Sequence, residues 1–343
     1  FQRKATQERI PALKTDIARL SDPSYQEQGL RRRAREQAAI GLPETDVPAR
    51  GVHVQLGIAW PYGYAWPQVT DDLEELLGRR IPVVVTFRDF QSSFPMLDCR
   101  EAKFRGKTLQ ITWEPWHFAN PQAITLPGII RGKHDQYIDS WAAAAKSFGS
   151  EVWIRWGHEF NGNWYPWTVA ANNRDPQIYV KAFRHVRDRF TRIGASNVRW
   201  IWCMNAETVP NASWNDPFRA YPGDAYVDMV AIDGYNFGET LPSSNWLSFT
   251  AIFQDKYARI IGDPRLRHKP VMIGETGCAT VGGDKAAWIR DMDNALRRTF
   301  TRIEGVVWFE AQKEADWRMI SSPQTLAVSR TMWNRNYYKR GVL

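Results

Sequence analysis

The stretch EVWIRWGHEFNGNWYPW, residues 151–167, changes character partway along its length. Its beginning, EVWIRW, is dominated by β-branched and aromatic side chains, which predicts a short buried strand. Residues 155–167 hold one carboxylate, one histidine, two asparagines and five aromatic residues, interrupted by glycine and proline. No single packed face accommodates that mixture. The stretch therefore predicts a strand that ends in a polar loop rich in aromatic rings.

Seven further strand-like runs accompany this one, and helical segments separate several of them. The eight runs are VHVQLGIAW (52–60), IPVVVTFRDF (81–90), TLQITWEPW (108–116), EVWIRWGHE (151–159), VRWIWCMN (198–205), VDMVAIDGY (227–235), KPVMIGETG (269–277) and GVVWFEAQ (305–312). The helix-like segments are 136–149, 175–194 and 286–300. Apolar strands alternating with amphipathic helices indicate a parallel sheet covered by helices. Residues 51–343 are therefore predicted to form an α/β fold, a (β/α)8 TIM barrel. A doubly wound sheet is the competing fold, but the chain has no GxGxxG turn.

Residues 1–50 differ from the rest because they are polar, basic and helix-prone, and they include the run RRRAR at 31–35. They predict a helical N-terminal extension, either a linker from an upstream segment or a clamp on the barrel.

The charge and hydropathy of the sequence limit the kinds of partner that the protein can be expected to bind. The 343 residues carry a net charge of +8, which is typical of a solubility charge; attraction to an acidic polymer or membrane surface is the alternative. The chain has no nucleic-acid-binding motif. It has no apolar run of about 18 residues, so membrane attachment would need an upstream anchor. The sequence starts at Phe1 and not at a methionine, so the removal of a signal peptide is left as an open alternative. We expect a monomer that is secreted or held in the cell envelope. The three cysteines have no metal-ligand spacing, and one disulfide between two of them is left open.

The 17 tryptophans are the unusual feature of the composition. Many lie beside Gly, Pro or Asn in predicted loops, where rings are often exposed and suit the apolar faces of sugars. The alternative is that they cap the core. The rings expected in the loops are Trp60, Trp66, Trp113, Trp116, Trp164 and Trp167.

Two glutamates lie where the predicted strands end. Glu159 follows the fourth run, and Glu275 closes the seventh in MIGETG. Active sites of such barrels lie at the C-terminal ends of the strands. Facing carboxyls there suit glycoside hydrolysis, in which one protonates the leaving oxygen and the other attacks the anomeric carbon or activates water. The same rim is predicted to hold Asn205, Tyr235, Trp308 and the turn Trp113-Glu114-Pro115-Trp116, with Arg155, His158 and Tyr235 tuning the carboxyls.

Other kinds of site have weaker support in the sequence. The chain has six histidines and no HExxH motif, so no metal and no cofactor are expected. It has no GxSxG motif for serine catalysis. A non-catalytic sugar-binding barrel remains the alternative, since it would keep the tryptophans but would not need both carboxylates.

The motif WGHEFNGNWYPW resembles the fourth-strand region of glycoside hydrolase family 26. DMVAIDGYN, PVMIGETG and VVWFEAQKEADWRM resemble its sixth, seventh and eighth strand regions in the same order, and the resemblance covers about residues 51–317. It implies a (β/α)8 barrel and a retaining mechanism without a metal. The implied roles are Glu159 as acid/base, Glu275 as nucleophile, His158 orienting Glu159, Trp164 bordering the cleaved bond, Tyr235 bonded to the nucleophile and Trp308 as the sugar platform.

The resemblance also bounds the substrate, a β-linked polysaccharide. The family includes β-mannanases, mixed-linkage β-glucanases and β-xylanases, and its mannanases tend to carry a histidine near the end of the third strand. Here Glu114 stands at that position, which favours glucan over mannan. A bacterial exopolysaccharide is a third class, slightly favoured by the basic extension.

Overall fold

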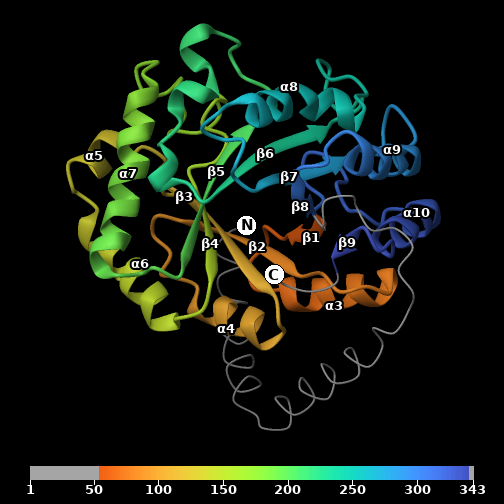
Figure 1. The fold of residues 1–343 in the computed structure, drawn as a ribbon, viewed down its shortest axis with the longest axis horizontal. Helices are drawn as coiled ribbons and strands as arrows, with labels where there is room; N and C mark the ends of the chain where they lie inside the picture. Colours follow the sequence, from red (N-terminus) through yellow and green to blue (C-terminus); the bar gives the residue numbers. More distant parts are fainter. Residues whose placement is uncertain (1–53, 340–343) are drawn as a thin grey trace.

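The computed structural model describes residues 54–339, so the predicted extension at 1–50 lies outside the described residues. Eight parallel strands follow one another around a closed sheet (Figure 1). They are β1 (Val54–Ala59), β2 (Val83–Asp89), β3 (Thr108–Glu114), β4 (Val152–Trp156), β5 (Val198–Asn205), β6 (Met229–Asn236), β7 (Val271–Cys278) and β8 (Ile303–Phe309). All eight predicted runs are strands, which confirms the (β/α)8 barrel.

The first strand closes the barrel because β1 pairs with both β2 and β8. Gly57 is aligned with Val83 on one side and Val307 on the other. A Cβ atom at Gly57 would lie 2.9 Å from Val307 Cγ2, so the missing side chain lets β1 fit between its neighbours. A short ninth strand, β9 (Tyr338–Lys339), adds to the start of β1.

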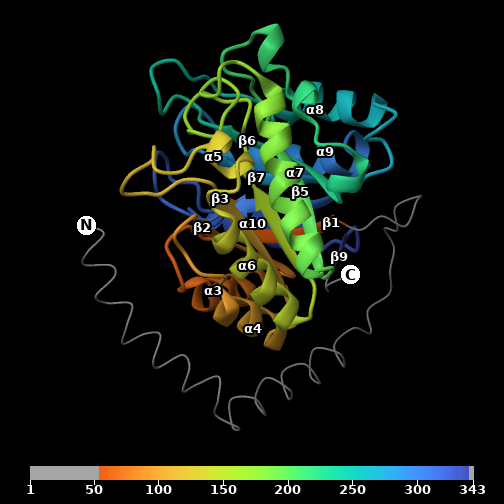
Figure 2. The same cartoon turned by 90° about the vertical axis from the view of Figure 1, so that its left-hand side faces the viewer.

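Helices surround the strands, and Figure 2 shows the long helix α7 running across the front of them. They are α3 (Trp66–Leu77), α4 (Met96–Phe104), α5 (Leu126–Ile130), α6 (Asp135–Phe148), α7 (Pro176–Ile193), α8 (Phe249–Gly262), α9 (Lys285–Arg298) and α10 (Pro323–Trp333). The three helix-like segments of the sequence correspond to α6, α7 and α9. Between β5 and β6 the chain forms three short 3-10 helices, η1 (Ser213–Asn215), η2 (Pro217–Ala220) and η3 (Asp224–Tyr226). None of the helices in residues 54–339 is long and apolar enough to cross a bilayer.

Strand alternation divides the core into two clusters. The larger lies between strands and helices and includes Ile111, Ile154 and Trp202. The smaller fills the barrel interior and includes Val85 and Cys203. Side chains on the same strand face as the interior cluster therefore point toward the barrel axis, which decides which residues can meet at its mouth.

All three cysteines, Cys99, Cys203 and Cys278, are buried and unpaired, so the disulfide left open by the sequence does not form in this structure. Cys203 is a small, fully buried residue of the apolar strand β5.

Candidate active site

A buried arginine lies at the centre of the site. Arg155 of β4 is fully buried, and its Nη1 donates to Asp233 Oδ2 of β6 at 2.6 Å. Its Nη2 donates to Glu275 Oε1 of β7, and to Thr112 Oγ1 of β3 at 2.8 Å. Burial alone lowers the pKa of an arginine, but the charges of Asp233 and Glu275 outweigh it and hold the pKa of Arg155 above its ordinary value. One cation on β4 thus bonds to side chains of three other strands, β3, β6 and β7, beneath the mouth.

Glu275 has both carboxylate oxygens occupied. Oε1 accepts from Arg155, and Oε2 accepts from the hydroxyl of Tyr235. Burial, followed by the charge of Glu275, raises the pKa of Tyr235 well above its ordinary value, so the phenol keeps its proton and remains a donor. These two donors fix the side chain in one orientation.

Glu159 sits on an unusual turn directly after β4. Gly157 and Glu159 have φ angles of 56° and 53°. These angles lie in the left-handed region of backbone conformation, which residues other than glycine seldom adopt. The Glu159 N–H donates to the carbonyl of Cys203 at 3.0 Å, and its own carbonyl accepts from Gly162 N–H at 2.9 Å. Such backbone strain is typical of functional sites, where the surrounding contacts hold it in place.

The Glu159 carboxyl is also held at both oxygens, but by neutral groups. Asn205 Nδ2 donates to Oε1 and Trp164 Nε1 donates to Oε2, each at 2.8 Å. Burial, and then the charge of Glu275, raise the pKa of Glu159 to about 7, although the two hydrogen bonds lower it. Glu159 can therefore carry a proton near neutral pH, as a general acid requires.

Asn161 holds the backbone of Asn205 in place through two hydrogen bonds. Its side chain is fully buried; its Oδ1 accepts from Asn205 N–H at 2.8 Å, and its Nδ2 donates to the Asn205 carbonyl at 2.9 Å. The sequence reasoning missed this role, as it missed that of Asp233. The available signals were the first asparagine of the HEFNGNW motif and an aspartate inside the otherwise apolar strand run VDMVAIDGY.

His158 is buried beside the carboxylates and packs against Tyr165 and Trp167, with ring centroids 5.1 and 5.8 Å apart. Burial, with the charges of Arg155 and Lys313, lowers the pKa of His158 well below its ordinary value, so the ring is neutral.

Glu114 supplies a third carboxyl. It ends β3 on the same strand face as Thr112, and its Oε2 accepts a long hydrogen bond of 3.4 Å from Trp116 Nε1. Burial raises the pKa of Glu114 to about 8, and the charge of Glu275 adds to the rise. This side chain is a neutral hydrogen-bonding group at the mouth at neutral pH.

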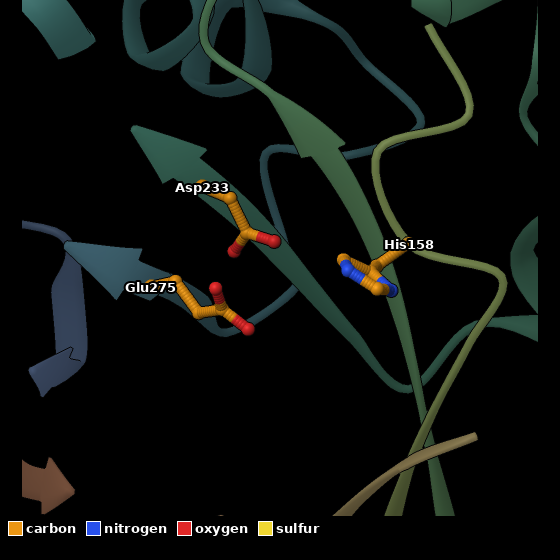
Figure 3. Close-up of side chains that lie close together, drawn as sticks. All are labelled: His158, Asp233 and Glu275. Atoms are coloured by element: carbon orange, nitrogen blue, oxygen red, sulfur yellow. The ribbon is translucent and has the colours of Figure 1, made fainter. Parts of the chain in front are cut away.

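His158, Asp233 and Glu275 could be taken for a metal site, because one possible ligand atom of each lies within 4.8 Å of the others (Figure 3). Arg155, however, donates to both carboxylates. A cation bound among these groups would meet the positive guanidinium, so the arrangement is that of an ion-pair network.

The expected sugar-binding roles of Trp113 and Trp308 are wrong. Both rings are fully buried, because the two residues sit on the outward faces of β3 and β8. Trp113 stacks on Trp141 of α6 with centroids 4.1 Å apart, and Trp308 packs edge-on against Trp288 of α9.

The other tryptophans that the sequence placed in open loops range from fully buried to exposed. Trp66 and Trp167 are 1% exposed; the indole of Trp66 donates to Asp98 Oδ1 and that of Trp167 to the His158 carbonyl. Trp60 and Trp116 are partly buried, and Trp164 is 43% exposed. The expectation that all six rings are open is therefore corrected for Trp66, Trp113 and Trp167.

Trp317, in the segment after β8, packs with the interior cluster and was not singled out from the sequence. It packs on Tyr235 with centroids 4.9 Å apart, next to the nucleophile candidate.

Comparisons with known proteins agree with this geometry. The model of the family described as glycosyl hydrolase family 26 matches residues 129–291. Endoglucanase H from Acetivibrio thermocellus is 38% identical over 262 residues, which are 75% of this chain and 28% of that protein. A mannan endo-1,4-beta-mannosidase from Bacillus subtilis is 29% identical over 201 residues, 54% of this chain and 48% of that protein. The chain thus spans less than half the length of either relative.

A solved structure shares the fold. The catalytic domain of a family 26 endo-beta-1,4-mannanase from Bacillus sp. JAMB-750 superposes with a TM-score of 0.66 at 15% identity, over 84% of this chain and 87% of that one. The family model over residues 129–291, the similarity to Endoglucanase H and the barrel with Glu159 after β4 and Glu275 on β7 agree with one another: this chain is similar to glycosyl hydrolase family 26.

Proposed function

We propose that the protein is a retaining, endo-acting glycoside hydrolase that cleaves a β-linked polysaccharide with Glu159 as acid/base and Glu275 as nucleophile. The observation that carries this proposal is the difference between the two carboxyls. Glu159 has neutral hydrogen-bond partners and a pKa of about 7, whereas Glu275 is bonded to the cation of Arg155. Glycosidases assign acid and nucleophile roles through such a difference in setting.

The first step breaks the glycosidic bond. Glu159 gives its proton to the leaving oxygen while a Glu275 oxygen bonds to the anomeric carbon, and the released chain end departs as an alcohol. Arg155 and Tyr235 hold the attacking carboxylate in place. The second step reverses the roles. Glu159, now ionised, takes a proton from water, whose oxygen bonds to the anomeric carbon as the bond to Glu275 breaks.

Glu159→Ala and Glu275→Ala distinguish the two roles. With an activated aryl β-glycoside, Glu159→Ala should accumulate the covalent intermediate, and azide should restore turnover. Glu275→Ala should form no intermediate. Proton NMR of fresh product should show the β-anomer first, so an initial α-anomer would exclude retention. Azide rescue of Glu114→Ala instead of Glu159→Ala would move the acid role to Glu114.

For the substrate we infer a β-1,4- or mixed-linkage β-glucan ahead of β-mannan, with a bacterial exopolysaccharide as a third class. Two observations support this order: the similarity to Endoglucanase H and the carboxyl of Glu114 at the end of β3. A panel of β-glucans, mannans, xylans and exopolysaccharides with product analysis tests it. Glu114→His should lower activity on glucan relative to mannan; an unchanged ratio would remove Glu114 from the argument.

Endo action rests on the partly open rings Trp60, Trp116 and Trp164. Viscosity of the polymer should fall while reducing ends are still few. Release of monosaccharide alone from the start would indicate action at chain ends. If the wild-type protein binds a glycan but releases no product from any polymer, the binding-only alternative replaces this proposal.

A further inference from the structure

Gly162 lies under the exposed indole that contacts Glu159. A Cβ atom added at Gly162 would lie 2.5 Å from Cζ2, 2.6 Å from Cε2 and 2.7 Å from Cη2 of Trp164. Real Cβ atoms essentially never approach other atoms this closely, so a side chain at 162 would displace the ring. Cε2 is bonded to Nε1, the atom that donates to Glu159 Oε2 at 2.8 Å. The displaced part of the ring is therefore the part that makes the hydrogen bond.

We propose that Gly162 is a positioning residue for the acid/base: its missing side chain lets the Trp164 indole lie flat on the backbone and hold the Glu159 carboxyl. This inference rests on the proposed role of Glu159.

The backbone does not need glycine at this position. The φ angle of Gly162 is not in the left-handed region, unlike those of Gly157 and Glu159 in the same turn, so alanine is allowed by backbone conformation. The ring can yield without harm to the core because Trp164 is 43% exposed, whereas Gly162 itself is buried. Alanine should therefore move Trp164 and leave the fold intact.

Three variants test the proposal with the whole chain: Gly162→Ala, Trp164→Ala and the double variant. The matched control is Gly262→Ala at the end of α8, where an added Cβ meets nothing within 4 Å. For an aryl glycoside with a poor leaving group, which needs the acid, we expect kcat/KM of Gly162→Ala to fall roughly 10- to 100-fold. For a leaving group that departs without protonation, the glycosylation rate should change little.

The direction of the pH effect follows from the contacts of Glu159. Its hydrogen bond to Trp164 lowers the pKa of Glu159, so losing the bond raises it. The limb of the kcat/KM profile that falls at high pH should move to higher pH in Gly162→Ala. The charged groups facing Glu159 are Glu275, Arg155 and Asp233, and the phenols of Tyr165 and Tyr235 also face it. None of these groups is changed in this variant. In the Trp164→Ala background, Gly162→Ala should add almost nothing, because there is no ring to displace.

A second measurement does not depend on turnover. With 15N-labelled tryptophan, the indole N–H signal of Trp164, assigned by its loss in Trp164→Ala, should titrate with Glu159 in the wild type and not in Gly162→Ala. This signal together with an inactive wild type would overturn the proposed hydrolase function while supporting the positioning role. An active enzyme in which Gly162→Ala matches Gly262→Ala, or adds its full effect to Trp164→Ala, would overturn the positioning role alone.

Discussion

At the scale of single residues, the site depends on one guanidinium shared between two carboxylates. Asp233 and Arg155 are both fully buried, and Cys203 Sγ donates to the second oxygen of Asp233 at 3.0 Å. Asp233→Ala would leave Arg155 paired with Glu275, but Arg155 Nη1 and the Cys203 thiol would lose their carboxyl acceptor, and a buried donor left without its partner typically costs about 1–3 kcal/mol. We expect Asp233→Ala to lower the free energy of unfolding by a comparable amount, and kcat to fall because Arg155 can shift away from Glu275. Denaturant melts and kinetics measure both.

The control for this prediction is Asp255→Ala. Asp255 pairs with Lys256 at 2.7 Å, but its side chain is 69% exposed. Exposed pairs contribute about 0–1 kcal/mol. Equal losses of stability in the two variants would mean that the buried network is no more important than a surface pair.

Glu159 carries a second prediction at this scale. The proposed first step needs this carboxyl protonated, and its pKa is raised to about 7. We expect kcat/KM to fall as the pH rises through about 7, with a limb that disappears in Glu159→Ala when azide and an activated substrate are supplied. A profile that stays flat up to pH 9 would contradict the acid role of Glu159.

At the scale of elements, the sequence predicted all eight strands because continuous apolar runs bounded by turns are a strong local signal. It also predicted which strand ends carry Glu159, Glu275 and Tyr235.

The sequence did not predict correctly where the tryptophans of the strands lie. In β3 the outward face carries Trp113 and the inward face carries Glu114, since successive side chains alternate. The position of a tryptophan near a strand end did not reveal whether its side chain points into or out of the barrel. The roles of Asn161 and Asp233 were missed because their hydrogen-bond partners are distant in sequence.

That alternation gives a prediction for two tryptophans. Trp113→Ala should lower the free energy of unfolding by about 3–5 kcal/mol, because it leaves a cavity against Trp141. Trp164→Ala should change stability by less than about 1 kcal/mol but reduce kcat/KM strongly, because the exposed ring packs little and contacts Glu159. Thermal melts with kinetics at a temperature where both variants are folded check this. The reverse pattern would place Trp113 in the site.

At the scale of the whole molecule, the described contacts of the site come from the barrel. The groups that hold Glu159 and Glu275 lie on β4, β5, β6 and the loop after β4. We therefore predict that residues 1–50 are dispensable for chemistry, and that a chain without them retains turnover on a soluble substrate. Lost turnover in a truncated protein with an unchanged melting temperature would show a contribution to the site from this segment.

The pH dependence of stability also belongs to the whole molecule. Burial is the largest cause that raises the pKa of Glu114 to about 8 and those of Glu159 and Glu310 to about 7, from an ordinary value of 4.5. A carboxyl whose pKa is higher in the folded state binds its proton more tightly there. Its contribution to stability is complete below about pH 4.5 and is lost as the pH rises through the folded value.

Burial has the opposite effect on Lys285, whose pKa it lowers to about 8 from 10.5. The unfolded chain binds the Lys285 proton more tightly than the folded protein does. The contribution of Lys285 to the stability of the folded protein therefore increases only as the pH rises beyond about 8. Below about pH 6.5 the buried, neutral His158 opposes the carboxyls, because the unfolded chain binds its proton more tightly. Between about pH 6.5 and 8 the carboxyls therefore dominate, and the melting temperature should fall across that range.

Glu159→Gln separates one of these contributions from the rest. The amide cannot ionise, so the variant should resemble the wild type near pH 5 and melt at a higher temperature near pH 8. The gain is bounded by about 1.4 kcal/mol for each unit of pKa shift, and relaxation around the charged side chain reduces it. Glu75→Gln, at an exposed position of α3, is the control and should follow the wild type at both pH values. If Glu159→Gln also follows the wild type at pH 8, the Glu159 carboxyl does not carry the raised pKa on which its assignment as the acid depends.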